Sequence, residues 1–215
     1  MKFFIKDPGS AITHFIAAIL VLVSASPLLL KAARTPGILP IVAFSIFILS
    51  MLLLYTASTI YHSLDISEKV NKKLRKFDHM MIFILIAGSY TPICLISLKG
   101  MTGQGLCALV WTVAIIGVLV KAIWINCPKW FSSVIYIGMG WLCVLAFSQI
   151  FEALSKPAFG WLLAGGIIYT LGGIIYALKL PIFNARHRYF GSHEIFHLFV
   201  MGGSACHFVT MYLIA

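Results

Sequence analysis

Two histidines four residues apart open the last apolar segment of the chain, and they have the clearest capacity for metal chemistry. His193 and His197 are one helical turn apart, so on a helix both imidazoles lie on the same face. Two imidazoles with this spacing can bind one metal ion. A ligand from another segment would complete a three-nitrogen site.

A second polar pair, Ser58 and His62, closes an earlier apolar segment, and Asp78 stands at the start of the next one. Three neutral histidines, His62, His193 and His197, would leave the fourth tetrahedral position of a zinc ion for water. Such a zinc lowers the pKa of its water to about 7 and polarises a carbonyl. We therefore predict a zinc site in which Asp78 accepts a proton from the water. Ser58, one turn from His62, is predicted to hydrogen-bond the water or the oxyanion.

The segment from His193 to His197 also matches the H-E-x-x-H pattern of zinc proteases, in which the glutamate is the general base. A protease of this type needs a third ligand and a cleft for an extended substrate, and the sequence identifies neither. Glu194 also lies about 100° around the helix from His193. A zinc protease is therefore the minor alternative.

The other special residues are interpreted as structural. The histidines assigned to packing or to the membrane interface are His14, His79, His187 and His207. The 5 cysteines show no CxxC pairing and are expected to be free thiols among apolar residues. Pro92 is expected to kink its helix. The small residues expected to allow close helix packing are Gly165, Gly166, Gly172 and Gly173.

The elements that must position these residues are membrane-spanning helices. Of the 215 residues, 61% are hydrophobic and only 10% are charged, whereas a soluble domain carries roughly 25% charged residues. Seven apolar runs can each cross roughly 30 Å of hydrocarbon as a helix. The predicted spans are residues 12–30, 39–61, 80–98, 106–120, 131–151, 158–178 and 195–215. We expect an all-α integral membrane protein, a single seven-transmembrane helix bundle over residues 1–215.

The basic residues give this bundle a direction. Under the seven-span scheme, four of the 16 Lys and Arg residues fall on the side opposite the N-terminus, namely Lys31, Arg34, Lys99 and Lys156. The other twelve fall on the N-terminal side: Lys2, Lys6, Lys69, Lys72, Lys73, Arg75, Lys76, Lys121, Lys129, Lys179, Arg186 and Arg188. This asymmetry predicts a cytoplasmic N-terminus and an outside C-terminus. The net charge of +10 therefore reflects topology rather than nucleic-acid binding.

The same scheme brings the candidate residues to one depth. His62 ends a span on the cytoplasmic side, whereas Asp78 and the pair His193 and His197 begin spans from that side. Hydropathy and charge alone define the spans, so this agreement is independent of the metal hypothesis. It is the strongest functional signal in the sequence.

Taken together, these motifs resemble the hemolysin III family, the bacterial branch of the superfamily of adiponectin and progestin receptors. The segments that carry the resemblance are Ile12-Thr-His14, Tyr55-x-x-Ser58-x-x-x-His62, Gly88-Ser-Tyr-Thr-Pro92 and Ser192-His-Glu-Ile-Phe-His197. It implies seven helices with a cytoplasmic N-terminus, and zinc held by His62, His193 and His197, with Asp78 on the metal water. In the adiponectin receptors a glutamine stands at the position of Glu194, which argues against the protease alternative.

The resemblance also implies a set of functions. The superfamily is similar to alkaline ceramidases in its metal motifs, which suggests hydrolysis of a lipid amide. Bacterial members have a reported cell-lysing activity, and some are linked to membrane lipid homeostasis. We therefore expect a multi-pass protein of the bacterial inner membrane whose partners are membrane lipids, with a lipid or fatty acid bound in the bundle.

Three functions compete at this point. The first is zinc-dependent hydrolysis of a lipid amide or ester. The second is a non-enzymatic membrane sensor or regulator, in which zinc only ties the second span to the seventh. The third is a cytolysin, against which the chain shows neither a secretion signal nor an amphipathic strand pattern.

Overall fold

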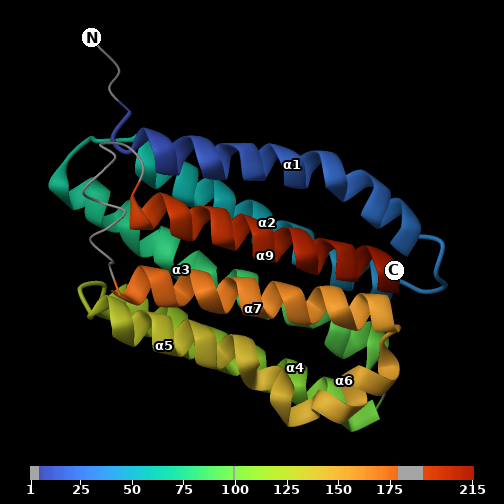
Figure 1. Ribbon diagram of the computed structural model, residues 1–215. Helices are drawn as coiled ribbons and strands as arrows, with labels where there is room; N and C mark the ends of the chain where they lie inside the picture. Colours follow the sequence, from blue (N-terminus) through green and yellow to red (C-terminus); the bar gives the residue numbers. More distant parts are fainter. Residues whose placement is uncertain (1–4, 99, 179–190) are drawn as a thin grey trace.

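The computed structural model describes residues 5–98, 100–178 and 191–215, and within these ranges it contains helices and no strand (Figure 1). The long helices are α1 (Pro8–Ala32), α2 (Leu39–Ser63), α3 (Glu68–Pro92), α4 (Gly100–Ile123), α7 (Lys156–Leu178) and α9 (Ser192–Ile214). The remaining span is built from α5 (Lys129–Gly140), the 3₁₀ segment η2 (Trp141–Ala146) and α6 (Phe147–Ala153). In this part of the chain, 7 helical segments are long and apolar enough to cross a membrane. The prediction of a seven-helix bundle is confirmed.

Two helices extend well beyond the predicted spans. α3 begins at Glu68, because the Ser67 hydroxyl caps its start by accepting a hydrogen bond from the Val70 amide at 3.3 Å. Its first turns carry basic residues that hydropathy alone assigns to a loop. α4 runs over residues 100–123 rather than 106–120, since small and polar residues continue the helix past both ends of the apolar run.

Two spans are interrupted. After Pro92, α3 continues as the π-helical segment η1 (Ile93–Ser97), which is one of the ways in which a chain accommodates a proline in a helix. The structure thus changes from an α-helix to a π-helix directly after Pro92, where the sequence predicts a kink. Hydropathy does not predict the break between α5 and α6 at Trp141–Ala146.

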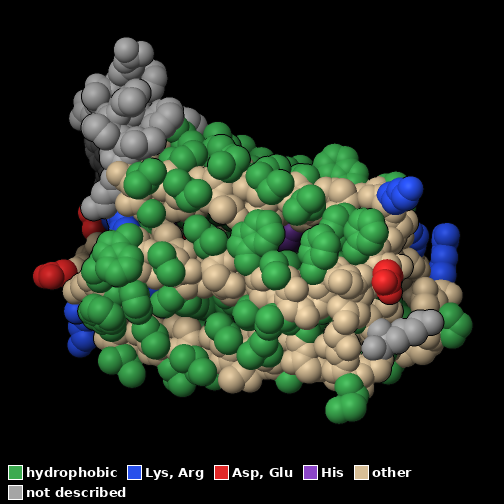
Figure 2. All heavy atoms as spheres, turned by 60° about the horizontal axis from the view of Figure 1, so that its bottom comes forward, with side chains coloured by type: hydrophobic (Ala, Val, Ile, Leu, Met, Phe, Trp, Pro, Cys, Tyr) green, Lys and Arg blue, Asp and Glu red, His purple; other side chains and the backbone are tan. Residues whose placement is uncertain are grey.

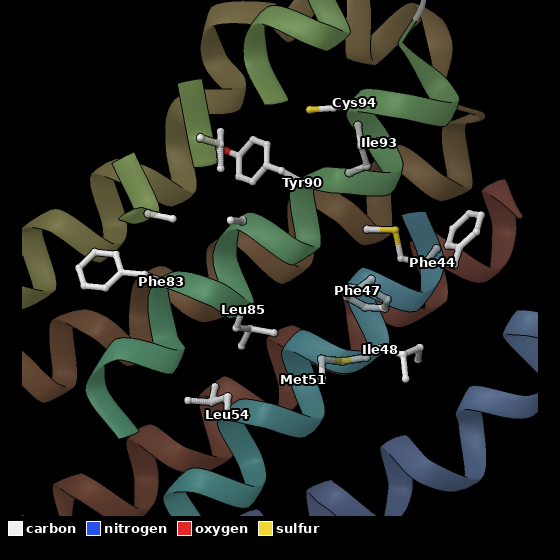
Figure 3. Packing of buried hydrophobic residues seen from close by; sticks show 14 of the residues in the cluster. Phe44, Phe47, Ile48, Met51, Leu54, Phe83, Leu85, Tyr90, Ile93 and Cys94 are labelled. Atoms are coloured by element: carbon white, nitrogen blue, oxygen red, sulfur yellow. The ribbon is translucent and has the colours of Figure 1, made fainter. Parts of the chain in front are cut away.

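Helix α2 packs against both α1 and α3 and contributes many side chains to the buried core (Figure 1). One face of α2 places Phe44, Phe47, Ile48, Met51 and Leu54 against its neighbours, and all five are buried. Figure 3 shows Leu54 of α2 beside Leu85 of α3, whereas Ile48 points away from α3. The spacing of three and four residues along α2 is that of a single helical face.

The lateral surface is apolar, and the charged side chains gather at the two ends of the bundle (Figure 2). Many large hydrophobic side chains are exposed there, including Leu20 at 58% and Val23 at 71% on α1. A surface of this kind suits lipid rather than water. The basic residues Lys2, Lys99, Lys179, Arg186 and Arg188, and also His187, lie outside the described residues.

Helices α7 and α9 pack along their length (Figure 1), and two of the five glycines in α7 explain how. A Cβ added at Gly165 would lie 2.3 Å from the ring of His207, and one at Gly172 would lie 2.6 Å from Phe199. These glycines let the two helices approach closely, as predicted. Gly173 instead meets Ile137 of α5, and a Cβ at Gly166 would meet nothing within 4 Å.

Candidate metal centre

Three histidines from two helices converge at the end of the bundle that holds the start of α1. His62 lies in the last turn of α2, and His193 and His197 occupy the first two turns of α9. One nitrogen from each ring can be chosen so that all three lie within 4.8 Å of one another. His62 and His197 are only 3% and 2% exposed. The sequence predicts that these three histidines lie at one depth in the membrane, and the fold brings their side chains together.

The separation of the nitrogens matches a shared ion. The Nε2 atoms of His62 and His193 are 3.2 Å apart. Two nitrogens that each bind a tetrahedral zinc at about 2.0–2.1 Å lie about 3.3–3.4 Å from each other. The His193 and His197 rings, with centroids 4.6 Å apart, are tilted by 58° rather than stacked. The three residues therefore fit a metal ion with at least three nitrogen ligands.

A carboxylate that the sequence does not single out orients His62. The Asp7 carboxylate accepts a hydrogen bond from His62 Nδ1 at 2.9 Å. The Asp7 backbone amide also donates to the His62 carbonyl at 2.9 Å, which satisfies one of the free carbonyls at the C-terminal end of α2. Because His62 donates the hydrogen on its Nδ1 to Asp7, its Nε2 atom is left to face the other histidines. Carboxylates placed in this way are the usual partners of metal-binding histidines.

Helix α1 supplies a similar contact to His197. The Thr13 hydroxyl donates to the Gly9 carbonyl at 2.9 Å, so its oxygen is available as an acceptor. His197 Nδ1 lies 3.4 Å from that oxygen, a long contact that favours the tautomer with Nε2 free. Sequence reasoning misses both Asp7 and Thr13, because their role depends on how α1 packs against α2 and α9.

Glu194 does not take the role that the H-E-x-x-H pattern assigns to it. One carboxylate oxygen accepts from the Ser10 hydroxyl at 2.6 Å, and the other accepts from the Gly191 amide at 2.8 Å. The second contact caps the start of α9, and the first ties α9 to α1. Both oxygens are thus occupied by structural contacts, which leaves the protease alternative without a general base.

Asp78 is buried in α3, and it is 7% exposed. Its Oδ2 atom lies 3.3 Å from Nδ1 of His79, and the same nitrogen lies 2.9 Å from the Arg75 carbonyl. The Tyr136 hydroxyl donates to the His79 carbonyl at 3.1 Å and so links this turn of α3 to α5. Asp78 lines the same cavity as His193 and His197, and it is not one of the three grouped ligands.

Two further side chains face this cavity. Ser58 is 1% exposed, and its hydroxyl makes no hydrogen bond to any described residue. His14 of α1 stacks on His197 with ring centroids 3.7 Å apart, and its edge meets Tyr55 at 5.0 Å. Neither ring nitrogen of His14 has a partner among the described residues. His14 thus packs against its neighbours, as expected, but it also lines the cavity beside the candidate ligands.

The cavity continues from the histidines far into the bundle, and its wall is mostly apolar. Besides the polar residues named above, side chains of α3, η1, α5, α6, α7 and α9 line it, among them Ile82, Ile86, Ile93, Ile137, Phe147, Phe159, Leu162 and Val200. In Figure 2 a histidine side chain is visible at the bottom of a hollow between hydrophobic side chains. A chain of methylene groups fits such a wall better than a polar molecule does.

Comparison with known proteins shows which family the chain is similar to. A family model described as "Haemolysin-III related" matches residues 3–208. The chain is 40% identical to "Hemolysin-3" from Bacillus cereus over 209 residues, which cover 97% of this chain and 91% of that protein. It is 39% identical to the "Hemolysin-3 homolog" of Bacillus subtilis (strain 168) over 203 residues, 94% of this chain and 91% of the relative. A shorter match of 61 residues, 36% identical, joins 27% of this chain to 14% of the "Adiponectin receptor protein" of Drosophila melanogaster.

Proposed function

The chain belongs to the Haemolysin-III related family of multi-pass membrane proteins, and from this premise we propose that it is a zinc-dependent hydrolase of a lipid amide or ester. One observation carries the proposal: nitrogens of three histidines converge on one point, and two of these histidines, His193 and His197, line a cavity whose wall is mostly apolar. Imidazole nitrogens suit zinc, and three of them leave a position open for catalysis. The apolar wall indicates the substrate class, a molecule with an acyl chain.

The metal would be held by His62, His193 and His197. Zinc in such a site polarises a carbonyl and lowers the pKa of water, which is the chemistry that hydrolysis requires. Asp78 faces the same cavity and is buried beside His79, so its carboxylate accepts the proton of the attacking water. The Ser58 hydroxyl has no other described partner and donates a hydrogen bond to the oxygen of the substrate carbonyl.

The substrate enters from the membrane. The cavity is walled by both α5 and α7, and Gly140, Gly166 and Gly173 lie along this part of the wall. We propose that an acyl chain enters through this part of the wall without leaving the hydrocarbon. The excess of Lys and Arg on the N-terminal side supports a position of the histidines in the cytoplasmic leaflet of the bacterial inner membrane, so the polar head of the lipid approaches from that leaflet.

The test uses the full chain, purified in detergent, loaded with zinc and incubated with a bacterial lipid extract. We expect released fatty acid, detected by mass spectrometry. Asp78→Asn should lower the rate by about 100-fold or more, the scale of general-base catalysis, while the zinc content stays at the wild-type level. Asp65→Asn, which alters an exposed loop carboxylate bonded to Asn71, is the matched control. Wild-type protein that holds stoichiometric zinc and releases no fatty acid contradicts the proposal.

A structural zinc is the second candidate, and one observation favours it. His62 and His193 belong to α2 and α9, so an ion between them joins two helices that are far apart in the sequence. If the zinc is structural, Asp78→Asn should leave the cellular phenotype of the wild type intact, whereas His193→Ala should abolish that phenotype. The pair of variants separates a catalytic zinc from a structural one.

A further inference from the structure

A second cluster of reactive side chains lies away from the histidines, at the turn between α4 and α5. It consists of Lys121 in the last turn of α4, Cys127 in the connecting segment and Ser132 in the first turn of α5. Lys121 Nζ lies 3.0 Å from Cys127 Sγ and 2.5 Å from Ser132 Oγ. The sulfur and the hydroxyl oxygen are 3.2 Å apart. Three nucleophilic atoms are thus in mutual contact.

The cluster is sequestered, since the three residues are 3%, 7% and 4% exposed. No described carboxylate forms an ion pair with Lys121, and the ring of Tyr136 lies 6.0 Å from its Nζ. A buried ammonium needs a partner that can carry negative charge. Among the contacts of Lys121 with described residues, only the thiol of Cys127 can supply this charge.

The surroundings also favour the reactive form of the thiol. Burial raises the pKa of Cys127, but the hydrogen bonds from Lys121 and Ser132 and the charge of Lys121 outweigh this effect and leave the pKa below its ordinary value. A thiolate is the nucleophilic form of cysteine, and it is the form that peroxides oxidise. The other four cysteines have no lysine contact in the described structure.

We propose that Cys127 and Lys121 form a redox-sensitive covalent crosslink when the protein meets a hydroperoxide. The thiolate attacks the peroxide, so an S–O bond forms, the O–O bond breaks, and the departing oxygen takes a proton from the lysine ammonium. The free amine then attacks the sulfur of the sulfenic acid, an S–N bond forms, and water leaves. With hydrogen peroxide, one thiolate and one ammonium give one sulfenamide and two waters. Sulfur is oxidised and the peroxide is reduced.

The position of the pair gives the crosslink a structural consequence. The bond joins the end of α4 to the segment that leads into α5, and so it fixes the start of α5. Ser133, Tyr136 and Ile137 of α5 line the cavity of the candidate metal centre. The modification therefore acts on one wall of that cavity, and it does not depend on the metal or on hydrolysis.

The experiment treats the purified full chain with hydrogen peroxide and measures the intact mass and the tryptic peptides. We expect a product lighter than the reduced protein by H₂, with Lys121 joined to Cys127 and cleavage after Lys121 blocked. A thiol reductant should restore the original mass. The mass alone does not identify the crosslink, because a disulfide between two other cysteines also removes H₂. Peptide mapping of the wild-type chain distinguishes the two products, since a disulfide links two cysteines whereas the proposed crosslink links Lys121 to Cys127.

Variants sharpen the assignment. Lys121→Arg keeps the positive charge but lacks the amine, so oxidation should stop at Cys127 with a gain of oxygen. Ser132→Ala keeps both reacting atoms and should still crosslink. A chain in which Cys94, Cys107, Cys143 and Cys206 are replaced by alanine cannot form an internal disulfide and should still lose H₂. Oxidised wild-type protein in which Lys121 remains unmodified and cleavable by trypsin overturns the proposal.

Discussion

Two groups of buried and partly buried polar side chains lie next to each other in the bundle, and they differ in how their polar atoms are paired. In the tyrosine–serine cluster, formed by Tyr55, Tyr169 and Ser204, the Ser204 oxygen lies 2.6 Å from one phenol oxygen and 2.7 Å from the other. Each hydroxyl there has a partner. In the histidine cluster, formed by His62, His193 and His197, the Nε2 atoms of His62 and His193 face each other at 3.2 Å, and that of His62 is an acceptor because its Nδ1 donates to Asp7.

This difference between the two clusters distinguishes polar groups that serve only helix packing from polar groups that can bind a ligand. Polar groups that complete one another need no ligand, and in a membrane they hold helices together. Acceptors that point at a common centre repel one another unless a cation or proton lies between them. His14 marks the boundary, because its ring touches Tyr55 on one side and His197 on the other. Variants in the two clusters should therefore fail in different assays.

The largest effect is expected from removal of a histidine ligand. His193→Ala should lower zinc affinity by more than about 100-fold, since the loss of a ligand exceeds the roughly 10–100-fold effect of a residue that only orients one. Competition against a chelator of known affinity measures the change. Tyr169→Phe, in the other cluster, is the control and should bind zinc as the wild type does. Equal affinities for wild type and His193→Ala would remove the distinction between the clusters.

A smaller loss is expected when the orientation of His62 is disturbed. Asp7→Asn keeps the size of the side chain but not its charge, and it should weaken zinc binding by about 10-fold. The expected loss is at the low end of the roughly 10–100-fold range for residues that orient a ligand, because the Asp7 side chain is 41% exposed and water can replace part of its contact with His62. The same titration tests it, with Asp65→Asn alongside. If both aspartate variants match the wild type, Asp7 does not belong to the site.

The smallest effect is expected in the tyrosine–serine cluster. Ser204→Ala leaves both phenol groups without their shared partner, which costs about 1 kcal/mol of stability and should lower the midpoint of thermal unfolding. Zinc content should not change. Thr112→Ala, whose hydroxyl bonds only to the Ala108 carbonyl of its own helix, is the matched control. A loss of zinc in Ser204→Ala would show that the clusters act as one unit.

Hydropathy is enough to predict the number of spans and their approximate positions, although not their exact ends, and the predicted depth of His62, Asp78, His193 and His197 follows from these positions. A helix in lipid must satisfy its own backbone, so run length determines the element. Asp7 cannot be found in this way, because its contact with His62 joins the start of α1 to the end of α2. A carboxylate directly before an apolar run is the only local signal, and carboxylates are favoured at the start of any helix. The structural role of Glu194 is equally hidden in the sequence, since it depends on Ser10.

X-ray absorption at the zinc edge would show which atoms surround the metal in the purified chain. Binding by His62, His193 and His197 predicts one zinc per chain with three imidazole nitrogens at about 2.0–2.1 Å and one oxygen ligand. The shell should lose nitrogen in His197→Ala. A shell containing sulfur at about 2.3 Å would place the metal on the cysteines instead, and would contradict the assignment of His62, His193 and His197.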